Sequence, residues 1–442
     1  MVSEYKVRAY PGELATFVLD NWGTGNAGGC LDAESLPDPK VLEHLISVCY
    51  QASLLREEER PVRFRLIFRP PEGFPADEGP PAGLHRLLFR NTLPFTEREL
   101  RKLSPSVDFY GSLIGAWHDE KDEPMIWGIV HSGLRWAQSL YGGGKKSQPL
   151  PGCLVIHVTN PGRITVSNGS IEIGTLSSGE IVCPSTGVFD SAWLRSAFAP
   201  IAKEEFALHT EARKRAKKPW AALDPEFFRV LKKQVIMRII GRIRSARHGG
   251  TLIFIPDERK EAFISENPYV KFKYRFVDEE PRRRFRTIIA GIGNALAESY
   301  GSHENPERKV GWTDYLASKN QTLSWLDESL FEWAHLVAGM ALVDGAVAIT
   351  SRFELIGFGA EISGKLEQID TAAIALDPEG KEMRHELTDC VGTRHHSAYS
   401  LCNALHDVLA VVVSQDGTVQ LVRWNEGMVT IWDQLSPSLI DA

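Results

Sequence analysis

The sequence has few of the features that mark secreted and membrane proteins. Its six cysteines are far apart and include no Cys-x-x-Cys pair: Cys30, Cys49, Cys153, Cys183, Cys390 and Cys402. So sparse a set excludes a disulfide-rich scaffold, and we expect reduced thiols. The sequence does not open with a basic stretch followed by a hydrophobic run, so no secretory signal is expected. The longest apolar run, residues 336–350, contains Asp344 and is too short and too polar to cross a bilayer. We therefore expect a soluble cytoplasmic protein without a membrane partner.

Charge of one sign is not in large excess either. The 442 residues include 50 Lys and Arg and 57 Asp and Glu, a formal net charge of −7. With 43% hydrophobic and 24% charged residues, the composition is that of an ordinary globular protein, which excludes wholesale disorder. The length predicts two or three domains.

Residues 1–205 are rich in Pro and Gly and carry short apolar or alternating runs, which is typical of strands. Residues 62–68 alternate at first, and residues 154–158 form an apolar run that ends at a turn. A helix is predicted over 39–55, where apolar residues recur at helical spacing. This region is interpreted as a strand-rich mixed domain.

Residues 206–310 have a different composition, with charged helices and basic faces. Asp224 before Pro225 is a helix start signal, and the apolar stripe that follows stops at residues 248–250. A buried strand is predicted over 251–255, and a second helix from Pro281 to about Gly301. We interpret the region as a basic helical connecting segment that ends in a linker at 301–308.

Residues 311–442 alternate between helix and strand, which predicts a mixed sheet flanked by helices and an α+β class for the whole chain. An apolar stripe marks a helix around Leu323 to Val337. The other predicted elements are strands over 346–349, 354–359, 371–375, 408–413, 419–422 and 428–432, and a helix over 397–405.

Three polar segments of this last region could carry chemistry. Asp344-Gly345 stands where an apolar helix is expected to give way to a buried strand. A carboxylate there can bind a metal or accept a hydroxyl proton, and glycine lets a ligand approach the backbone. The same dipeptide is also typical of a tight turn that only changes direction.

The second segment, residues 389–398, is a loop that leads into a helix, and the third, residues 414–417, follows a predicted strand. Backbone N–H groups at a helix N-terminus, the Thr393 hydroxyl and the Arg394 guanidinium could bind phosphate. Alternatively, Thr393 or Ser397 caps the helix and Arg394 pairs with a surface acid. Residues 414–417 alone predict a hairpin turn.

In this order, Asp344-Gly345-Ala346, then Gly392-Thr393-Arg394-His395 opening a helix, then a strand ending in Ser414, the three segments resemble the diadenylate cyclase domain family. This is the catalytic domain of the DNA-integrity scanning protein and its relatives. The resemblance covers about residues 311–442. Residues 51–61 are similar to a probable sensor module found ahead of such domains.

The resemblance implies condensation of two ATP molecules into the second messenger cyclic di-AMP, with release of two pyrophosphates. Each protomer would hold one ATP, and two C-terminal domains would face each other. Catalysis would fall to Asp344, Arg394 and His395, with Mg²⁺ or Mn²⁺ held by Asp344 and Asp416. The nucleotide-binding residues would be Gly345, Ala346, Gly392, Thr393, His396, Ser397, Ser414 and Gln415.

Two departures from the family pattern support an alternative. The basic triplet Arg-His-Arg of the family is Arg394-His395-His396 here, and its Ser-Glu pair is Ser414-Gln415-Asp416. An imidazole that is mostly neutral at pH 7 replaces a guanidinium, and a carboxylate is lost or displaced by one residue. The alternative function is a nucleotide-binding sensor module with little or no turnover.

Other motifs fit less well. Residues 23–28 match the dinucleotide-binding pattern by letter, but no long helix follows. Cys390, His395, His396 and Cys402 do not have the usual zinc-ligand spacing. The basic runs 213–218 and 282–286 could contact nucleic acid, although neighbouring acids balance them, so a nucleic-acid partner is not expected.

Overall fold

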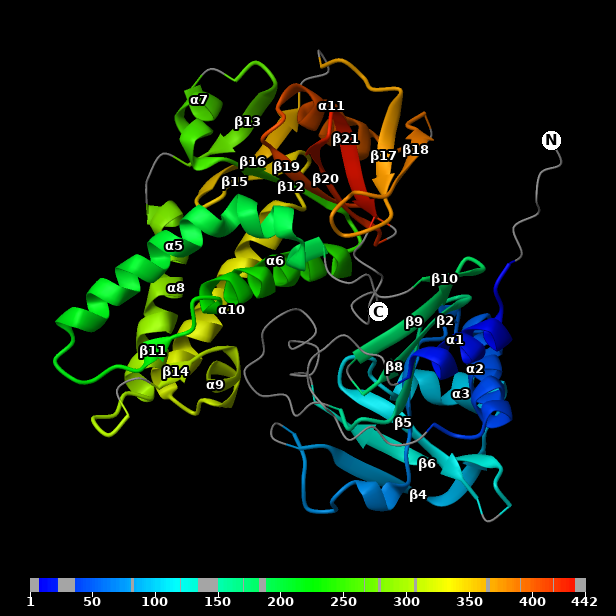
Figure 1. The fold of residues 1–442 in the computed structure, drawn as a ribbon. Coiled ribbons are helices and arrows are strands. Elements are labelled where there is room, and N and C mark those ends of the chain that lie inside the picture. Colours follow the sequence, from blue (N-terminus) through cyan, green and yellow to red (C-terminus); the bar gives the residue numbers. More distant parts are fainter. Residues whose placement is uncertain are drawn as a thin grey trace. The chain divides into compact units, whose positions relative to one another are not determined.

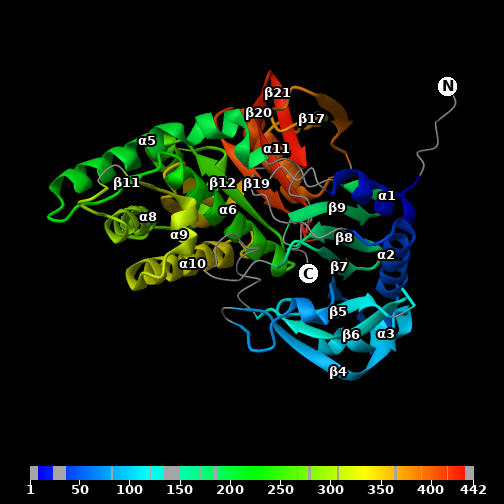
Figure 2. The ribbon, with the colours of Figure 1, turned by 60° about the horizontal axis from the view of Figure 1, so that its bottom comes forward.

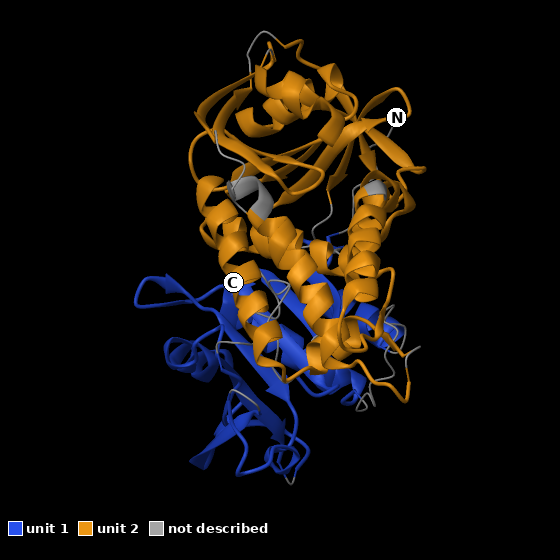
Figure 3. Cartoon of the chain, turned by 90° about the vertical axis from the view of Figure 1, so that its left-hand side faces the viewer, with its two compact units in different colours: residues 1–140, 146–184, 436–442 blue, residues 141–145, 185–435 orange. Residues whose placement is uncertain are grey.

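The computed structural model describes residues 8–22, 36–80, 83–119, 121–133, 150–169, 171–182, 188–265, 267–276, 280–305, 308–362, 366–389, 391–415 and 417–433. The chain forms two compact units, which Figure 3 shows in different colours. Unit 1 comprises residues 1–140, 146–184 and 436–442, and unit 2 comprises residues 141–145 and 185–435. Mixed sheets and helices in both units confirm the predicted α+β class.

Unit 1 is built on an eight-stranded sheet with the strand order β10-β9-β8-β7-β3-β5-β6-β4. Only the pair β3 and β5 is parallel. The strands are β3 (Phe64–Phe68), β4 (His85–Pro94), β5 (Ser112–His118), β6 (Pro124–His131), β7 (Leu154–Asn160), β8 (Arg163–Asn168), β9 (Ile171–Ser177) and β10 (Glu180–Val182). A short pair, β1 (Arg56–Glu57) and β2 (Arg60–Pro61), lies outside this sheet.

Helices cover one face of the unit 1 sheet. They are α1 (Pro11–Asn21), α2 (Pro39–Ser53) and α3 (Glu97–Leu103), and Figure 2 shows α1 and α2 beside β7, β8 and β9. The predicted helix over 39–55 is therefore confirmed as α2, whose N-cap Asp38 accepts a hydrogen bond from the Lys40 N–H. Alternate residues of the strands, such as Leu66 and Ile156, pack beneath these helices.

The opposite face of that sheet carries buried polar side chains. His157 lies opposite Thr165 in the strand register, and its Nε2 is 2.9 Å from Ser167 Oγ. Arg65 is fully buried beside it, and burial, assisted by the Arg65 charge, lowers the pKa of His157 well below its ordinary value. The alternation of the strands thus separates an apolar face from a polar one.

Unit 2 is built on a nine-stranded sheet with the strand order β13-β16-β15-β12-β19-β20-β21-β17-β18. Its strands are β12 (Gly250–Ile255), β13 (Val270–Arg275), β15 (Ala346–Thr350), β16 (Leu355–Ile362), β17 (Thr371–Ala375), β18 (Met383–Leu387), β19 (Leu409–Val413), β20 (Val419–Asn425) and β21 (Met428–Asp433). β12 at the centre pairs in parallel with β15 and antiparallel with β19. A separate two-stranded ribbon joins β11 (Ala222–Leu223) to β14 (Lys309–Val310).

Helices cover both faces of this sheet. On one face lie α5 (Ala192–Arg215), α6 (Phe227–Ser245), α8 (Glu280–Ser299) and α10 (Gln321–Met340), with the short α9 (Trp312–Ala317) nearby (Figure 1). On the other face lie α7 (Lys260–Ser265) and α11 (Thr393–Ala404). Because both faces of the sheet are buried, the sequences of β12, β15 and β19 are continuous apolar runs.

The predicted elements of residues 206–433 agree with this arrangement within a few residues, but their grouping differs. The strand predicted over 251–255 belongs to the predicted middle region. In the structure it is β12, which forms hydrogen bonds on both sides with strands from residues 311–442. α6 and α8 pack in the same core as α10. Along the chain, the division between the two compact units falls between residues 184 and 185.

No helix within the described ranges combines the length and the apolar character that crossing a membrane requires.

Candidate functional site

An open cavity of about 760 Å³ lies at one end of the three central strands of unit 2. Thr251 is the second residue of β12, Ala346 is the first of β15, and Ser414 follows the last residue of β19. The parallel pairing of β12 with β15 and its antiparallel pairing with β19 bring these three positions to the same end of the strands. The lining residues are Thr251, Asp344, Gly345, Ala346, Ala360, Glu361, Ile362, Gly392, Thr393, Arg394, His395, Ser397, Ser414 and Gln415. The three polar segments that the sequence analysis selected therefore share one cavity.

Asp344 and Gly345 form the turn between α10 and β15. The Asp344 side chain is exposed, so a ligand can reach its carboxylate. Gly345 has a φ of +112°, and a Cβ at this position would lie 2.6 Å from the carbonyl carbon of Gly359 in β16. Close approach of two backbones therefore requires glycine here even without a ligand.

The first turn of α11 forms the second wall. Gly392 is its N-cap and has no side chain with which to cap the first N–H groups. Arg394 Nη1 donates a hydrogen bond of 3.0 Å to the carbonyl oxygen of His248, which follows α6. This contact fixes the guanidinium at the cavity, and a helix N-terminus beside a guanidinium favours an anion.

The third wall is the turn between β19 and β20. Ser414 N–H donates to Thr418 O at 2.9 Å, which closes the predicted hairpin. Gln415 is exposed and lines the cavity with its uncharged amide. Asp416, predicted as a metal ligand, lies outside the described residues.

His396 is the predicted nucleotide-binding residue that does not line this cavity. Its ring is partly buried, on the helix turn that carries Arg394 and His395. The substitution of the family arginine at this position therefore alters a side chain outside the cavity wall.

Four lining residues were not among the predicted site residues: Ala360 and Ile362 of β16, and the two polar residues Thr251 and Glu361. Thr251 stands at the start of β12, and Glu361 lies near the end of β16, beyond the predicted strand boundary at residue 359. Glu361 Oε1 is 3.0 Å from Lys273 Nζ on the neighbouring strand β13. Their hydrogen bond and the charge of Glu361, with a smaller contribution from Asp344, raise the pKa of Lys273. No sequence motif marks Glu361, because only strand pairing brings it beside Asp344.

Within the described part of the chain, no group of three or more His, Cys, Asp or Glu side chains is arranged to hold a metal ion. Asp344 and Glu361 are the acidic side chains of the cavity wall. The zinc interpretation of Cys390, His395, His396 and Cys402 has no support among the described residues, and Cys390 itself is not described. Cys402 is fully buried, and burial raises the pKa of its thiol to about 12.

Comparison with known protein families identifies one module. Residues 31–131 match the family model described as Probable sensor domain DACNV. The match lies within unit 1 and includes α2 and β3 to β6, in agreement with the predicted sensor module. This sensor domain is associated with diadenylate cyclases. No curated protein and no solved structure matches the chain.

Proposed function

We propose that unit 2 is a diadenylate cyclase domain that condenses two ATP molecules into cyclic di-AMP and two pyrophosphates, and that the sensor region of unit 1 regulates it. The observation that carries this proposal is the convergence of Asp344-Gly345, Thr393-Arg394 and Ser414 on one cavity. The sensor match is consistent with it, because this sensor domain is associated with such enzymes.

Size and charge of the cavity suit a nucleoside triphosphate. A volume of about 760 Å³ lies within the range of roughly 300–1,000 Å³ typical of small-molecule sites. Arg394 and the N–H groups of the first turn of α11 would bind the phosphates, with His395 and Thr393 as further donors. The hydroxyl groups of Ser397 and Ser414 would contact the nucleotide.

A divalent cation fits the donor set. Mg²⁺ and Mn²⁺ prefer oxygen ligands, and Mg²⁺ is commonly bound through one or two carboxylates together with substrate phosphates. The carboxylates of Asp344 and Glu361 on the cavity wall would serve this purpose. When bound, the cation would neutralise phosphate charge as pyrophosphate leaves.

In each of the two condensations, a ribose 3′-oxygen attacks the α-phosphorus of the other nucleotide. One P–O bond forms, the bond to pyrophosphate breaks, and the hydroxyl proton leaves. Asp344 would orient this hydroxyl and accept its proton. One chain offers one such cavity among its described residues, so two protomers would face each other, and catalysis would rest mainly on positioning.

The competing function is nucleotide binding without turnover. Two observations favour it: Gln415 contributes an amide where the family has a carboxylate, and Arg394 is the cavity's lone arginine among the described residues. A site with fewer charges would still bind an adenine nucleotide but would stabilise the transition state less.

Incubation of the purified full chain with ATP and Mg²⁺ or Mn²⁺, followed by chromatographic separation of the products, tests the proposal. We expect cyclic di-AMP, and a loss of about a hundredfold or more in the Asp344→Asn variant, because several kcal/mol of charge stabilisation disappear. The exposed Asp370 lies outside the cavity, so Asp370→Asn is the matched control and should keep full activity. ATP binding without any cyclic dinucleotide, even at high protein concentration, would support the competing function instead.

A further inference from the structure

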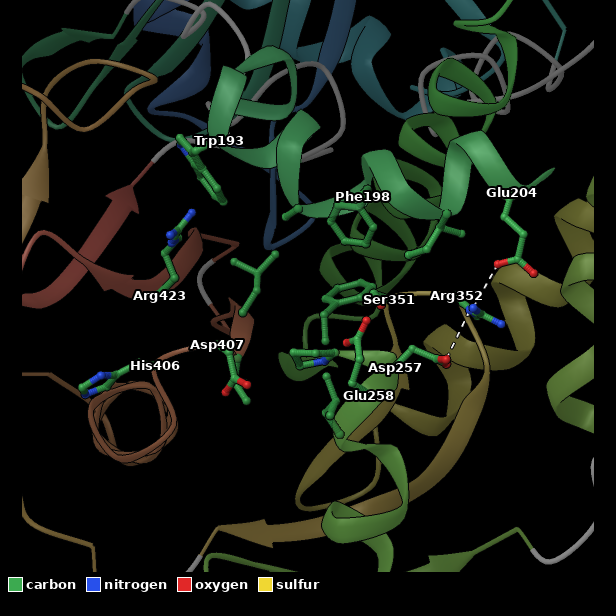
Figure 4. A pocket seen from close by; sticks show the side chains of 17 residues that line it. Trp193, Phe198, Glu204, Asp257, Glu258, Ser351, Arg352, His406, Asp407 and Arg423 are labelled. Carbon is green, nitrogen blue, oxygen red and sulfur yellow. Dashed lines mark ion pairs between the residues drawn. The ribbon is translucent and has the colours of Figure 1, made fainter. Parts of the chain in front are cut away.

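A second cavity of about 310 Å³ lies at the opposite end of the same central strands of unit 2 (Figure 4). β12 reaches it with Phe254 and Ile255, whereas Thr251 of the same strand lines the first cavity. Because β12 and β15 are parallel, their carboxyl ends meet at this edge. In α/β sheets, ligands bind preferentially at the carboxyl ends of parallel strands.

The N-terminal half of α5 covers one side of this second cavity. Phe198 and Ile201 of α5 face Val408 and Leu409 at the start of β19, which gives the cavity an apolar middle. Arg352, in the turn after β15, links the two sides: its Nη2 is 2.9 Å from Glu204 Oε2, and its Nε is 3.2 Å from Asp257 Oδ2. These ion pairs keep the cavity walls in place.

A guanidinium is available on one side of the cavity. Arg423 lies under the ring of Trp193, with its guanidinium carbon 4.6 Å from the ring centroid (Figure 4). Its Nε donates to the carbonyl oxygen of Trp424 at 3.0 Å. Among the described residues, neither terminal nitrogen of Arg423 has a hydrogen-bond or ion-pair partner, so both can bind an anionic group.

Carboxylates are available on the other side. Figure 4 shows Asp257 and Glu258 across the cavity from Trp193 and Arg423. Glu258 is exposed and makes no ion pair among the described residues. Burial, with further contributions from Glu354 and Glu258, raises the pKa of Asp257 despite Arg352. A cation placed here would relieve the repulsion between these acids.

We propose that this second cavity binds a small zwitterionic molecule of the ω-amino-acid class, in which an apolar chain separates the two charges, with its carboxylate at Arg423, its ammonium group at Glu258 and Asp257, and its chain against Phe198 and Val408. The Arg423 guanidinium and the Glu258 carboxylate, neither of which has an ion-pair partner among the described residues, lie on opposite sides of an apolar space and so select a ligand with both charges. The volume of this cavity is less than half that of the first cavity, which argues against a nucleotide. A ligand bound in this cavity would contact both α5 and the ends of the central strands.

Binding to the full chain tests the proposal directly. A series of ω-amino acids from β-alanine to 8-aminooctanoic acid, each at 10 mM, is screened by thermal shift, and the best binder is titrated by calorimetry together with its decarboxylated amine and its deaminated acid. We expect at least one amino acid to bind, and both analogues to bind about tenfold or more weakly, since each lacks one charge-assisted contact. A chain that binds no member of this series, or that binds the amine or the acid as tightly as the ω-amino acid, overturns the proposal.

Variants locate the site. Arg423→Gln should lower the affinity for the amino acid about tenfold, so that the amino acid binds no more tightly than the amine. Glu258→Gln should make the amino acid bind no more tightly than the acid. Ala197→Trp, at an exposed position of α5 on the cavity wall, should abolish binding by filling the space while leaving the charges intact. Arg215→Gln and Glu328→Gln, at exposed positions outside the cavity, are the matched controls. Unchanged binding in Ala197→Trp would contradict the assignment, whatever the result of the ATP experiments.

Discussion

At the scale of single residues, the Asp344-Gly345 pair shows that one dipeptide can satisfy folding and chemistry together. The positive φ of Gly345 and the nearby backbone of Gly359 require a residue without a Cβ. The same turn leaves the Asp344 carboxylate exposed in the cavity. The two interpretations of this dipeptide in the sequence, a tight turn or a ligand site, are therefore compatible.

Replacing Gly345 by Ala should lower the free energy of unfolding by about 1–3 kcal/mol or more, because the methyl group would meet the backbone of β16 in a strained conformation. Gly339 in α10 is the matched control, since no atom lies within 4 Å of the position of an added Cβ. Gly339→Ala should stabilise the protein by up to about 1 kcal/mol through helix propensity. Urea unfolding measures both changes, and equal stabilities of the two variants would contradict this account of the turn.

At the scale of elements, α5 is attached to α6 by a buried ion pair. Lys232 Nζ of α6 is 2.6 Å from Glu205 Oε2 of α5, and the two side chains are 5% and 7% exposed. Burial lowers the pKa of Lys232 and raises the pKa of Glu205, and the charge of each partner opposes the shift. Such a pair specifies how two helices meet more than it stabilises them, because desolvation offsets the attraction.

Lys232→Met should therefore lower the free energy of unfolding by about 3–5 kcal/mol, since it leaves a buried carboxylate without its partner. The double variant Lys232→Met with Glu205→Leu should recover most of this loss. In the single variant the pKa of Glu205 rises further, so the folded state retains a proton that the unfolded state releases, and the loss should shrink as the pH falls towards 5. Thermal unfolding across pH 5–8 checks both results. A single variant as stable as the double one would mean that water reaches the carboxylate.

At the scale of the whole molecule, a sensor-type unit precedes a unit whose central sheet carries a cavity at each end. Both cavities contact β12, but their chemistry differs: the first has a helix N-terminus and hydroxyl groups, and the second has an apolar middle between separated charges. Regulation of facing half-sites needs only a change in their relative placement, because the proposed catalysis rests on positioning.

If two protomers must face each other, cyclic di-AMP formation per protomer should rise with protein concentration and then level off. Excess Asp344→Asn protein should lower the rate of a fixed amount of wild type, because mixed pairs lack one carboxylate. Initial rates over a hundredfold range of protein concentration, with and without the variant, measure this. A rate per protomer that is independent of concentration in a chain shown to be monomeric would contradict the facing arrangement.

Local signals in the sequence were sufficient for much of unit 2. Asp224 and Pro225 predicted the start of α6 within two residues, and the apolar run 251–255 predicted β12. The helix α5 was not predicted, and it begins within the region interpreted as strand-rich. The edge strands β13 and β18 were not predicted either, because exposed charged residues obscure their alternation. Residues 23–28 of the dinucleotide-like motif lie outside the described residues.

The sequence alone determined which residue types form the three polar turns and where helices and strands begin around them, because caps, glycines and apolar periodicity act over a few neighbouring residues. Only the tertiary structure decided that Glu361 and Thr251 join those turns, that His396 does not, and that Arg423 and Glu258 occupy opposite sides of a second cavity. These placements depend on strand order and register, which arise from contacts between segments tens to more than a hundred residues apart in the chain. No local signal encodes such contacts, so they become visible only when the sheet has formed.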